Sequence, residues 1–258
     1  MFTSNPFAVL SESVPSSAIQ AYVGVMIALV VGGTLFDVWH KGSAAYFFAS
    51  WRNSRDRGTQ RVGGGKILSL AIQTALVEVL TSAEFGLGRR RVAHLLTMYG
   101  FLLYVVTTVV MVFCPAAATP AVLPQLWIAG ALLVCLGGYW FWFFIRVDVS
   151  AEGHTPFRIM RADLFILSLL ATTSLGLIWA ALQSVDSWGT YIVLVLYLIA
   201  TTVLFGSVPW SKFSHMFFKP AAAFEKRVSE AAGSRSNLPA PADKPETLGI
   251  ARERPRHY

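Results

Sequence analysis

The stretch RRVAHLLTMYGFLLYVVTTVVMVFCP, residues 90–115, decides the fold of this chain. It begins with two arginines, continues as a long apolar run and ends at Cys114 and Pro115. A helix needs about 20 apolar residues to cross the roughly 30 Å hydrocarbon core of a bilayer. Residues 94–114 meet that requirement, and a helix satisfies its own backbone hydrogen bonds in lipid. We therefore predict a transmembrane helix whose charged start lies at one membrane surface.

Four further segments have the same character. The composition agrees, because 55% of the residues are hydrophobic and only 14% are charged, which is unlike the balance of a soluble domain. With residues 94–114, the predicted spans are 18–39, 124–145, 163–183 and 189–209. The fold class predicted is an all-α integral membrane protein, a five-helix transmembrane bundle.

The positive charges set the orientation of this bundle. All 21 Lys and Arg residues fall on one side of the five spans, and the segments expected on the other side contain none. Cationic flanks are retained on the cytoplasmic face of a membrane. We predict a multi-pass protein of the bacterial cytoplasmic membrane, with the N-terminus outside and the C-terminus in the cytoplasm. Residues 1–17 form an outer segment, residues 18–220 the membrane domain and residues 221–258 a disordered cytoplasmic tail.

A long cytoplasmic stretch separates the first two spans. Residues 52–66 are polar and basic and are expected to be mobile. Residues 66–83 carry apolar residues at helical spacing, with Lys66 and Glu78 among the interruptions. This pattern predicts an amphipathic helix on the membrane or under a partner. A sixth span here would place many basic residues outside, so the charge pattern argues against it.

Composition also excludes several classes of function. The net charge of +7 lies in loops and a tail beside the spans, so it indicates contact with membrane lipid rather than with nucleic acid. Two cysteines, Cys114 and Cys135, are too few for a Cys-ligated iron–sulfur cluster or a disulfide framework. Any such cluster must belong to a partner protein.

Histidines gather near the cytoplasmic ends of the spans. His94 begins the second span after a run of arginines, and His215 follows the fifth. Two antiparallel helices can bring these positions to one depth, where two imidazoles would hold a six-coordinate haem b. Arg91 and Lys212 could pair with its propionates. The alternative is that interfacial histidines hydrogen-bond headgroups or neighbouring loops.

Four stretches of the chain carry a resemblance to a known family. They are RRVAHLLTMYGF (90–101), GALLVCLGG (130–138), RADLFILSLL (161–170) and VPWSKFSHMFFKP (208–220). They resemble the cytochrome b (gamma) subunit of respiratory nitrate reductase and the related anchors of heterodisulfide-reductase-like complexes. The resemblance covers about half of the chain and implies five spans of the same orientation. It also implies haem ligation by His94 and His215.

The chain departs from that family at the outer haem. The family's second haem uses histidines at the positions of Tyr104 and Tyr197. Because two tyrosines would be unusual ligands of one b-type haem, we expect a single haem and an outer half filled by side chains. The single-haem pattern resembles the anchor of adenylylsulfate reductase, an enzyme of sulfur metabolism.

A quinone site is expected near the inner haem, since no outer relay remains. The residues proposed for it are Asp37, His40, Trp210 and Lys212. Trp210 could stack on the ring, His40 or Lys212 could hydrogen-bond a carbonyl, and Asp37 or His40 could pass a proton. The alternative for each residue is an interfacial side chain with no ligand, and Asp37 in particular could be merely solvated.

The function expected is that of a quinone-reactive cytochrome b subunit of a respiratory oxidoreductase complex. It would anchor a cytoplasmic iron–sulfur or flavin enzyme and pass electrons between that enzyme and the quinone pool through one haem b. The alternative is a haem-free structural anchor with a quinone slot. A small transporter is disfavoured, because the sequence has no internal repeat and no charged or proline-broken span.

Overall fold

The computed structural model describes residues 4–40, 42–82, 88–115, 119–146, 157, 159–160, 163–185, 188–210 and 215–234. For Ser43 and residues 215–218 it describes the backbone only. Every regular element in this part of the chain is a helix. In chain order they are α1 (Pro6–Leu10), α2 (Ser16–His40), α3 (Ser43–Asp56), α4 (Gly64–Gln73), the π-helical η1 (Thr74–Leu80), α5 (Arg89–Phe113), α6 (Val122–Trp140), the π-helical η4 (Phe141–Ile145), α8 (Leu164–Leu182), α9 (Trp188–Gly206), the 3-10 turn η6 (Val208–Trp210) and α10 (His215–Ala232).

Five helices are long and apolar enough to cross a membrane: α2, α5, α6 continued by η4, α8 and α9. They coincide with the five predicted spans, so the all-α, multi-pass architecture is confirmed at that level. The largest difference is at the start of α5, where Arg89, Arg90 and Arg91 are helical and not part of a preceding loop. We use the predicted orientation to name the two ends of the bundle. The inner end carries His40 and Arg89, and the outer end is the opposite one.

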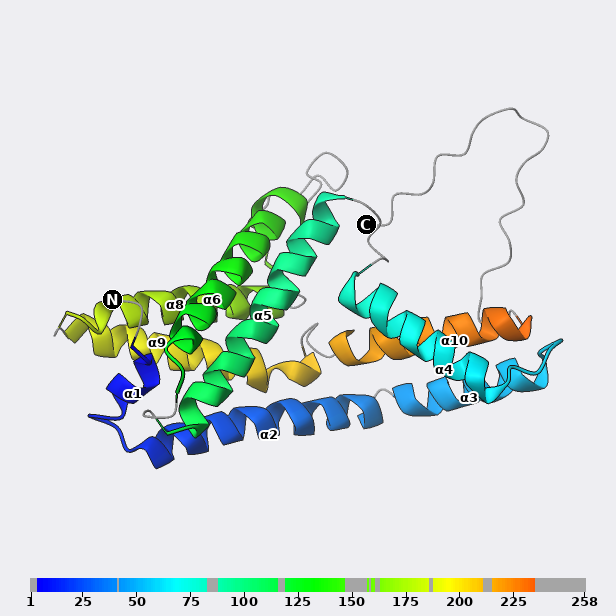
Figure 1. Cartoon of the computed structure of the whole chain (residues 1–258), viewed down its shortest axis with the longest axis horizontal. Helices are drawn as coiled ribbons and strands as arrows, with labels where there is room; N and C mark the ends of the chain where they lie inside the picture. The colour runs from blue at the N-terminus through cyan, green and yellow to red at the C-terminus, as the bar shows by residue number, and fades with distance from the viewer. Residues whose placement is uncertain are drawn as a thin grey trace.

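Glycines hold α5 and α6 together as a close antiparallel pair, which lies inclined across α2, α8 and α9 (Figure 1). A Cβ atom on Gly100 would lie 2.8 Å from the carbonyl oxygen of Gly130, and one on Gly137 would lie 2.6 Å from that of Ala93. Small residues let helix backbones approach where no hydrophobic force between helices exists. Gly100 and Gly137 therefore allow the backbones of α5 and α6 to approach closely.

Helix α2 packs much more loosely than the other spans. Only 6% of its most apolar window is buried, against 28–39% for the other four. It touches the bundle near both ends. Gln20 and Tyr22 donate hydrogen bonds to backbone carbonyls of α5 and α9, at 3.2 and 2.9 Å. Near the inner end, a Cβ on Gly33 would lie 3.1 Å from the Cβ of Val208.

Beyond the inner end, α3, α4, η1 and α10 form a helical layer that we call the inner lobe (Figure 1). Its centre is the buried carboxylate of Glu225 on α10. The Oε1 atom of Glu225 accepts hydrogen bonds from the hydroxyls of Ser50, Ser54 and Ser229 at 2.8, 3.2 and 2.8 Å. This network fastens α10 to α3.

Two sequence predictions differ from the structure in the inner lobe. Residues 52–56 belong to α3, where the prediction was a mobile segment, because Ser54 is buried under α10. Residues 221–232 belong to α10, where the prediction was the start of a disordered tail. The remainder of that tail, from residue 235, lies outside the described residues.

The helix predicted at residues 66–83 is present as α4 and η1, over residues 64–80. Leu68, Ile72 and Leu76 on one side of it are 52–63% exposed, whereas Glu78 forms a 2.7 Å ion pair with Arg227 of α10. The helix therefore turns one side toward α10 and leaves an apolar side exposed. Its cytoplasmic placement stays a prediction.

Candidate functional site

His94 lies in the second turn of α5, at the inner end, and is half-buried. Its Nδ1 atom lies 3.1 Å from the hydroxyl of Ser82, which follows η1. Ser82 is 2% exposed and has φ +48°, a left-handed conformation that is uncommon for a residue with a side chain. The hydrogen bond engages the Nδ1 atom of His94.

Two further contacts fix the end of η1 against α5. Arg91 donates from Nε to the carbonyl oxygen of Thr81 at 2.7 Å, and the hydroxyl of Tyr99 donates to that of Leu80 at 2.6 Å. The first contact uses one of the five N–H donors of the Arg91 guanidinium. Together they hold Ser82 beside His94.

His215 is the first residue of α10, and its side chain lies outside the described residues, as do Lys212, His154 and Arg161. The pairing of His94 with His215, and the role of Lys212, therefore stay predictions. Among the described residues, no three His, Cys, Asp or Glu side chains are grouped so that they could hold a metal ion on their own.

Tyr104 and Tyr197 meet in the outer half of the bundle, about 15 Å from His94 along α5 by the 1.5 Å rise per residue. Their hydroxyl oxygens are 2.9 Å apart, and the two residues are 4% and 5% exposed. Buried phenols usually find a hydrogen-bond partner, and here the two hydroxyls share one hydrogen bond.

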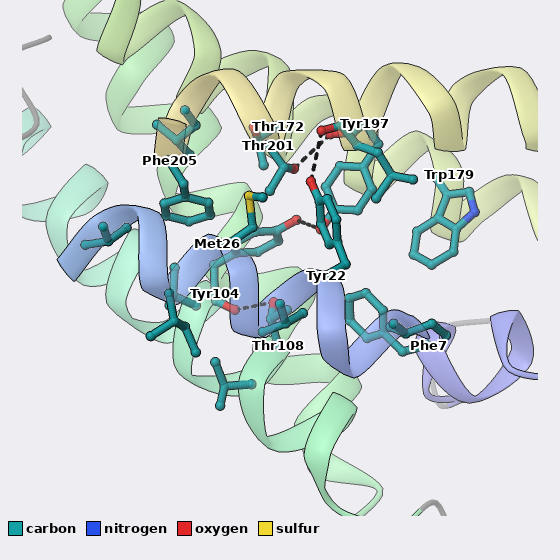
Figure 2. A pocket seen from close by; sticks show the side chains of 18 of the residues that line it. Phe7, Tyr22, Met26, Tyr104, Thr108, Thr172, Trp179, Tyr197, Thr201 and Phe205 are labelled. Atoms are coloured by element: carbon teal, nitrogen blue, oxygen red, sulfur yellow. Dashed lines mark hydrogen bonds between the residues drawn. The ribbon is translucent and has the colours of Figure 1, made fainter. Parts of the chain in front are cut away.

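The two tyrosines belong to a closed circuit of five aromatic side chains, of which Figure 2 labels Phe7, Tyr104, Trp179 and Tyr197. Tyr104 stacks on Trp127 at 5.0 Å, Tyr197 stacks on Trp179 at 5.7 Å, and Phe7 of α1 touches both tryptophans at 6.0 and 5.7 Å. This circuit joins α1, α5, α6, α8 and α9 at the outer end.

A cavity of about 480 Å³ lies between α2 and the helices α5, α8 and α9 (Figure 2). Its lining is apolar except for the hydroxyls of three tyrosines and three threonines and the edge of Trp179. Those hydroxyls belong to Tyr22, Tyr104, Thr108, Thr172, Tyr197 and Thr201. No charged residue lines it among the residues that the structure describes.

Sequence reasoning singled out Tyr104 and Tyr197 but missed the rest of this cavity. One signal was available: Tyr22 is a polar aromatic residue well inside the first span. Its hydroxyl donates to the Leu198 carbonyl and lies 3.0 Å from the hydroxyl of Thr202, both on α9.

One of the four residues predicted to form a quinone site, Lys212, lies outside the described residues. Asp37 is 2% exposed, so the interpretation that it is merely solvated is wrong. His40 is exposed and stacks on Phe36 at 5.4 Å, and Trp210 is 74% exposed. Asp37, His40 and Trp210 do not line the cavity beside α2.

An ion pair joins the inner ends of α6 and α8. Arg146 donates from Nε to Asp163 at 2.9 Å and also stacks over Trp142 at 4.1 Å. Asp163 accepts from the backbone N–H of Met160 at 2.8 Å. These contacts give Asp163 a structural role at the start of α8.

A scan of protein-family models and searches of curated proteins and solved structures found no match to this chain.

Proposed function

We propose that this protein is the membrane anchor and electron-transfer subunit of an oxidoreductase complex, with one haem b held by His94 and His215 near the inner end. It docks a cytoplasmic iron–sulfur or flavin enzyme, for which adenylylsulfate reductase is the leading candidate, and exchanges electrons with membrane quinone. The haem, when bound, would supply reversible one-electron transfer. The chain would supply the two imidazoles, the fixed orientation of one of them and a low-dielectric surrounding.

The observation that carries the proposal is the contact between Ser82 and His94. Histidines that bind metals almost always use their other ring nitrogen in a hydrogen bond, which fixes the tautomer and the ring orientation. Ser82 meets Nδ1 of His94 at 3.1 Å from a buried, conformationally unusual position.

The positive residues near His94 support the same proposal. Arg89, Arg90 and Arg91 open α5 one turn before His94. Guanidinium groups recognise carboxylates in a bidentate manner, and haem carries two propionates. Arg91 keeps further N–H donors beyond its bond to Thr81 and remains our candidate for that role, with Lys212 as the second.

Quinone exchange belongs to the same proposal. Asp37 and His40 near the inner end of α2 stay our candidates for proton transfer, and Trp210 for a ring contact. Of these, Asp37 has the most favourable surroundings for a functional carboxylate, because it is 2% exposed at a depth where ionisable groups are rarely without a role.

The test is the reduced-minus-oxidised absorption spectrum of the purified full-length chain. We expect a b-type α-band in the wild type, its loss in His94→Ala and His215→Ala, and its retention in His40→Ala as the matched control. Ser82→Ala should keep the band but lower haem occupancy, because losing the supporting hydrogen bond weakens metal binding by about 10–100-fold.

A wild-type chain that binds no haem after reconstitution with hemin would overturn the proposal. The haem-free anchor would then stand in its place. An unchanged spectrum in both histidine variants would show that the haem is held elsewhere.

A further inference from the structure

We propose that the α4 and η1 helix is a membrane-surface anchor. Its apolar stripe, which consists of Leu68, Ile72, Leu76 and Leu80, inserts into the lipid leaflet at the inner end of the bundle. The proposed function does not use this surface, and the anchor does not depend on the presence of haem. The sequence pattern left two occupants open, the membrane and a partner protein, and the contacts of the helix favour the membrane.

The apolar stripe is a continuous surface on one side of the helix. Its four side chains recur at every fourth position and are 63%, 52%, 52% and 45% exposed. Residues four positions apart are neighbours on a helix surface. A group of large exposed aliphatic side chains is uncommon on a soluble surface and marks a contact with protein or membrane.

The other side of the same helix is already occupied. Leu70 and Thr74 are 7% and 3% exposed, and Glu78 forms its 2.7 Å ion pair with Arg227 of α10, which runs beside the helix (Figure 1). Glu78 is one of only two charged residues in the helix, with Lys66. A helix with one apolar side exposed and its acidic side chain turned away from that side has the character of an interfacial helix.

The C-terminal end of this helix is fixed beside a membrane span. Arg91 donates from Nε to the carbonyl oxygen of Thr81 at 2.7 Å, and the hydroxyl of Tyr99 donates to that of Leu80 at 2.6 Å. Arg91 and Tyr99 are about 12 Å apart along α5, by the rise of 1.5 Å per residue. The end of η1 therefore lies along the first turns of a span, where the headgroups of a bilayer meet its acyl chains.

The stripe continues the surface that α5 turns to lipid. Val92, Tyr99 and Leu102 on α5 are 48%, 43% and 45% exposed. The hydrogen bond from Tyr99 holds Leu80, the last residue of the stripe, next to this surface. A soluble partner would have to displace lipid from α5 to cover Leu80, whereas lipid that surrounds the span reaches Leu80 directly.

Positive charges before and after the stripe match an anionic lipid surface. Arg61 and Lys66 are exposed at and before the start of the helix, and Arg89 is exposed at the start of α5. Glu78, which is paired with Arg227, is the only acidic residue in the stretch 57–82. Basic residues next to a membrane-inserted apolar surface strengthen its binding to anionic headgroups.

The test measures where the stripe lies when the chain is alone in a membrane. The full-length chain, with Cys114 and Cys135 replaced by serine, is reconstituted into vesicles of phosphatidylethanolamine and phosphatidylglycerol. A nitroxide is attached to Ile72→Cys or Leu76→Cys, and to Gln73→Cys as the matched control, because Gln73 is an exposed polar residue of the same helix. Power-saturation EPR then compares accessibility to oxygen, which enters lipid, with accessibility to a nickel chelate, which stays in water.

We expect the labels at Ile72→Cys and Leu76→Cys to be accessible to oxygen and to lose accessibility to nickel, because a polar chelate is excluded from acyl chains. The labels at Gln73→Cys and at the exposed Glu230→Cys of α10 should remain accessible to nickel.

Nickel accessibility at Ile72→Cys and Leu76→Cys as high as at Gln73→Cys would overturn the proposal and favour a partner protein as the occupant. Should a label at either position prevent reconstitution, Leu68→Cys gives the same readout at the other end of the stripe, and high nickel accessibility there would overturn the proposal equally.

Discussion

Replacing one of the two buried tyrosines in the outer half by phenylalanine should lower the free energy of unfolding at least as much as replacing both. Tyr197→Phe leaves the hydroxyl of Tyr104 at 4% exposure without the partner that lies 2.9 Å away. Hydrogen bonds between membrane helices contribute about 0.6 kcal/mol on average and up to about 1.7 kcal/mol. Both phenols here are almost fully buried, so we expect the upper part of that range, about 1–2 kcal/mol.

The double variant Tyr104→Phe/Tyr197→Phe removes donor and acceptor together and leaves no stranded hydroxyl at this position. Replacing both partners of a buried hydrogen bond by apolar groups of the same shape can be nearly neutral. The double variant should therefore be destabilised by no more than either single variant. The coupling between the two changes should be about 1 kcal/mol or more, well above the scatter of about 0.3–0.5 kcal/mol for independent sites.

The assay is reversible unfolding of the purified chain in mixed micelles with increasing SDS, followed by tryptophan fluorescence. Trp127 and Trp179 stack on the two tyrosines and report directly on this region. Tyr191→Phe is the control, because Tyr191 is 53% exposed and its replacement should change the free energy of unfolding by less than about 0.5 kcal/mol. Strictly additive single effects would refute the reasoning.

Three further predictions concern orientation, helix packing and the inner lobe. In intact cells, an impermeant maleimide should label the exposed Cys114 from outside. A cysteine placed at the exposed Glu230 should react only after lysis. The opposite labelling pattern would show that the orientation is inverted. In SDS unfolding, Gly137→Ala should destabilise the protein by about 1–3 kcal/mol, because its Cβ would clash with α5. Gly32→Ala should not destabilise it, because nothing lies within 4 Å of that position. Equal effects of the two substitutions would contradict the packing of α5 and α6. Glu225→Ala should cost about 1–3 kcal/mol and speed limited proteolysis of α10, because three buried hydroxyls lose their acceptor, and Glu230→Ala should leave cleavage unchanged.

The α4 and η1 helix shows why a partly correct sequence prediction can still miss the surroundings. Its periodic apolar residues were enough to predict a helix, since that pattern is local. The partner of its polar side is Arg227, almost 150 residues away in the chain and inside a segment predicted to be disordered. The tail from residue 221 was predicted to be disordered, but contacts with α3 and η1 stabilise α10 as a helix.

The candidate haem site was likewise predicted only in part from the sequence. The sequence identified His94 by its place after a basic run at the start of an apolar segment. It gave no indication of Ser82, because the contact depends on how η1 ends and returns to α5. A hydrogen bond to a ring nitrogen requires two atoms to lie within about 3 Å of each other. The spacing of residues in the sequence does not determine positions to that accuracy.

What the sequence by itself determined is the set of membrane-spanning helices, because about 20 successive apolar residues suffice to define a span regardless of what it packs against. The tertiary structure decided everything that depends on which faces of those helices meet. Tyr104 and Tyr197 lie 93 positions apart and form one hydrogen-bonded pair, and the cavity beside α2 is lined by residues of α2, α5, α8 and α9, which are far apart in the sequence. In a bilayer the apolar surface of a span is equally compatible with lipid and with protein, so hydrophobicity does not reveal its neighbours. Small residues such as Gly137 and a few polar contacts select them, and these act only between segments that the fold has already brought together.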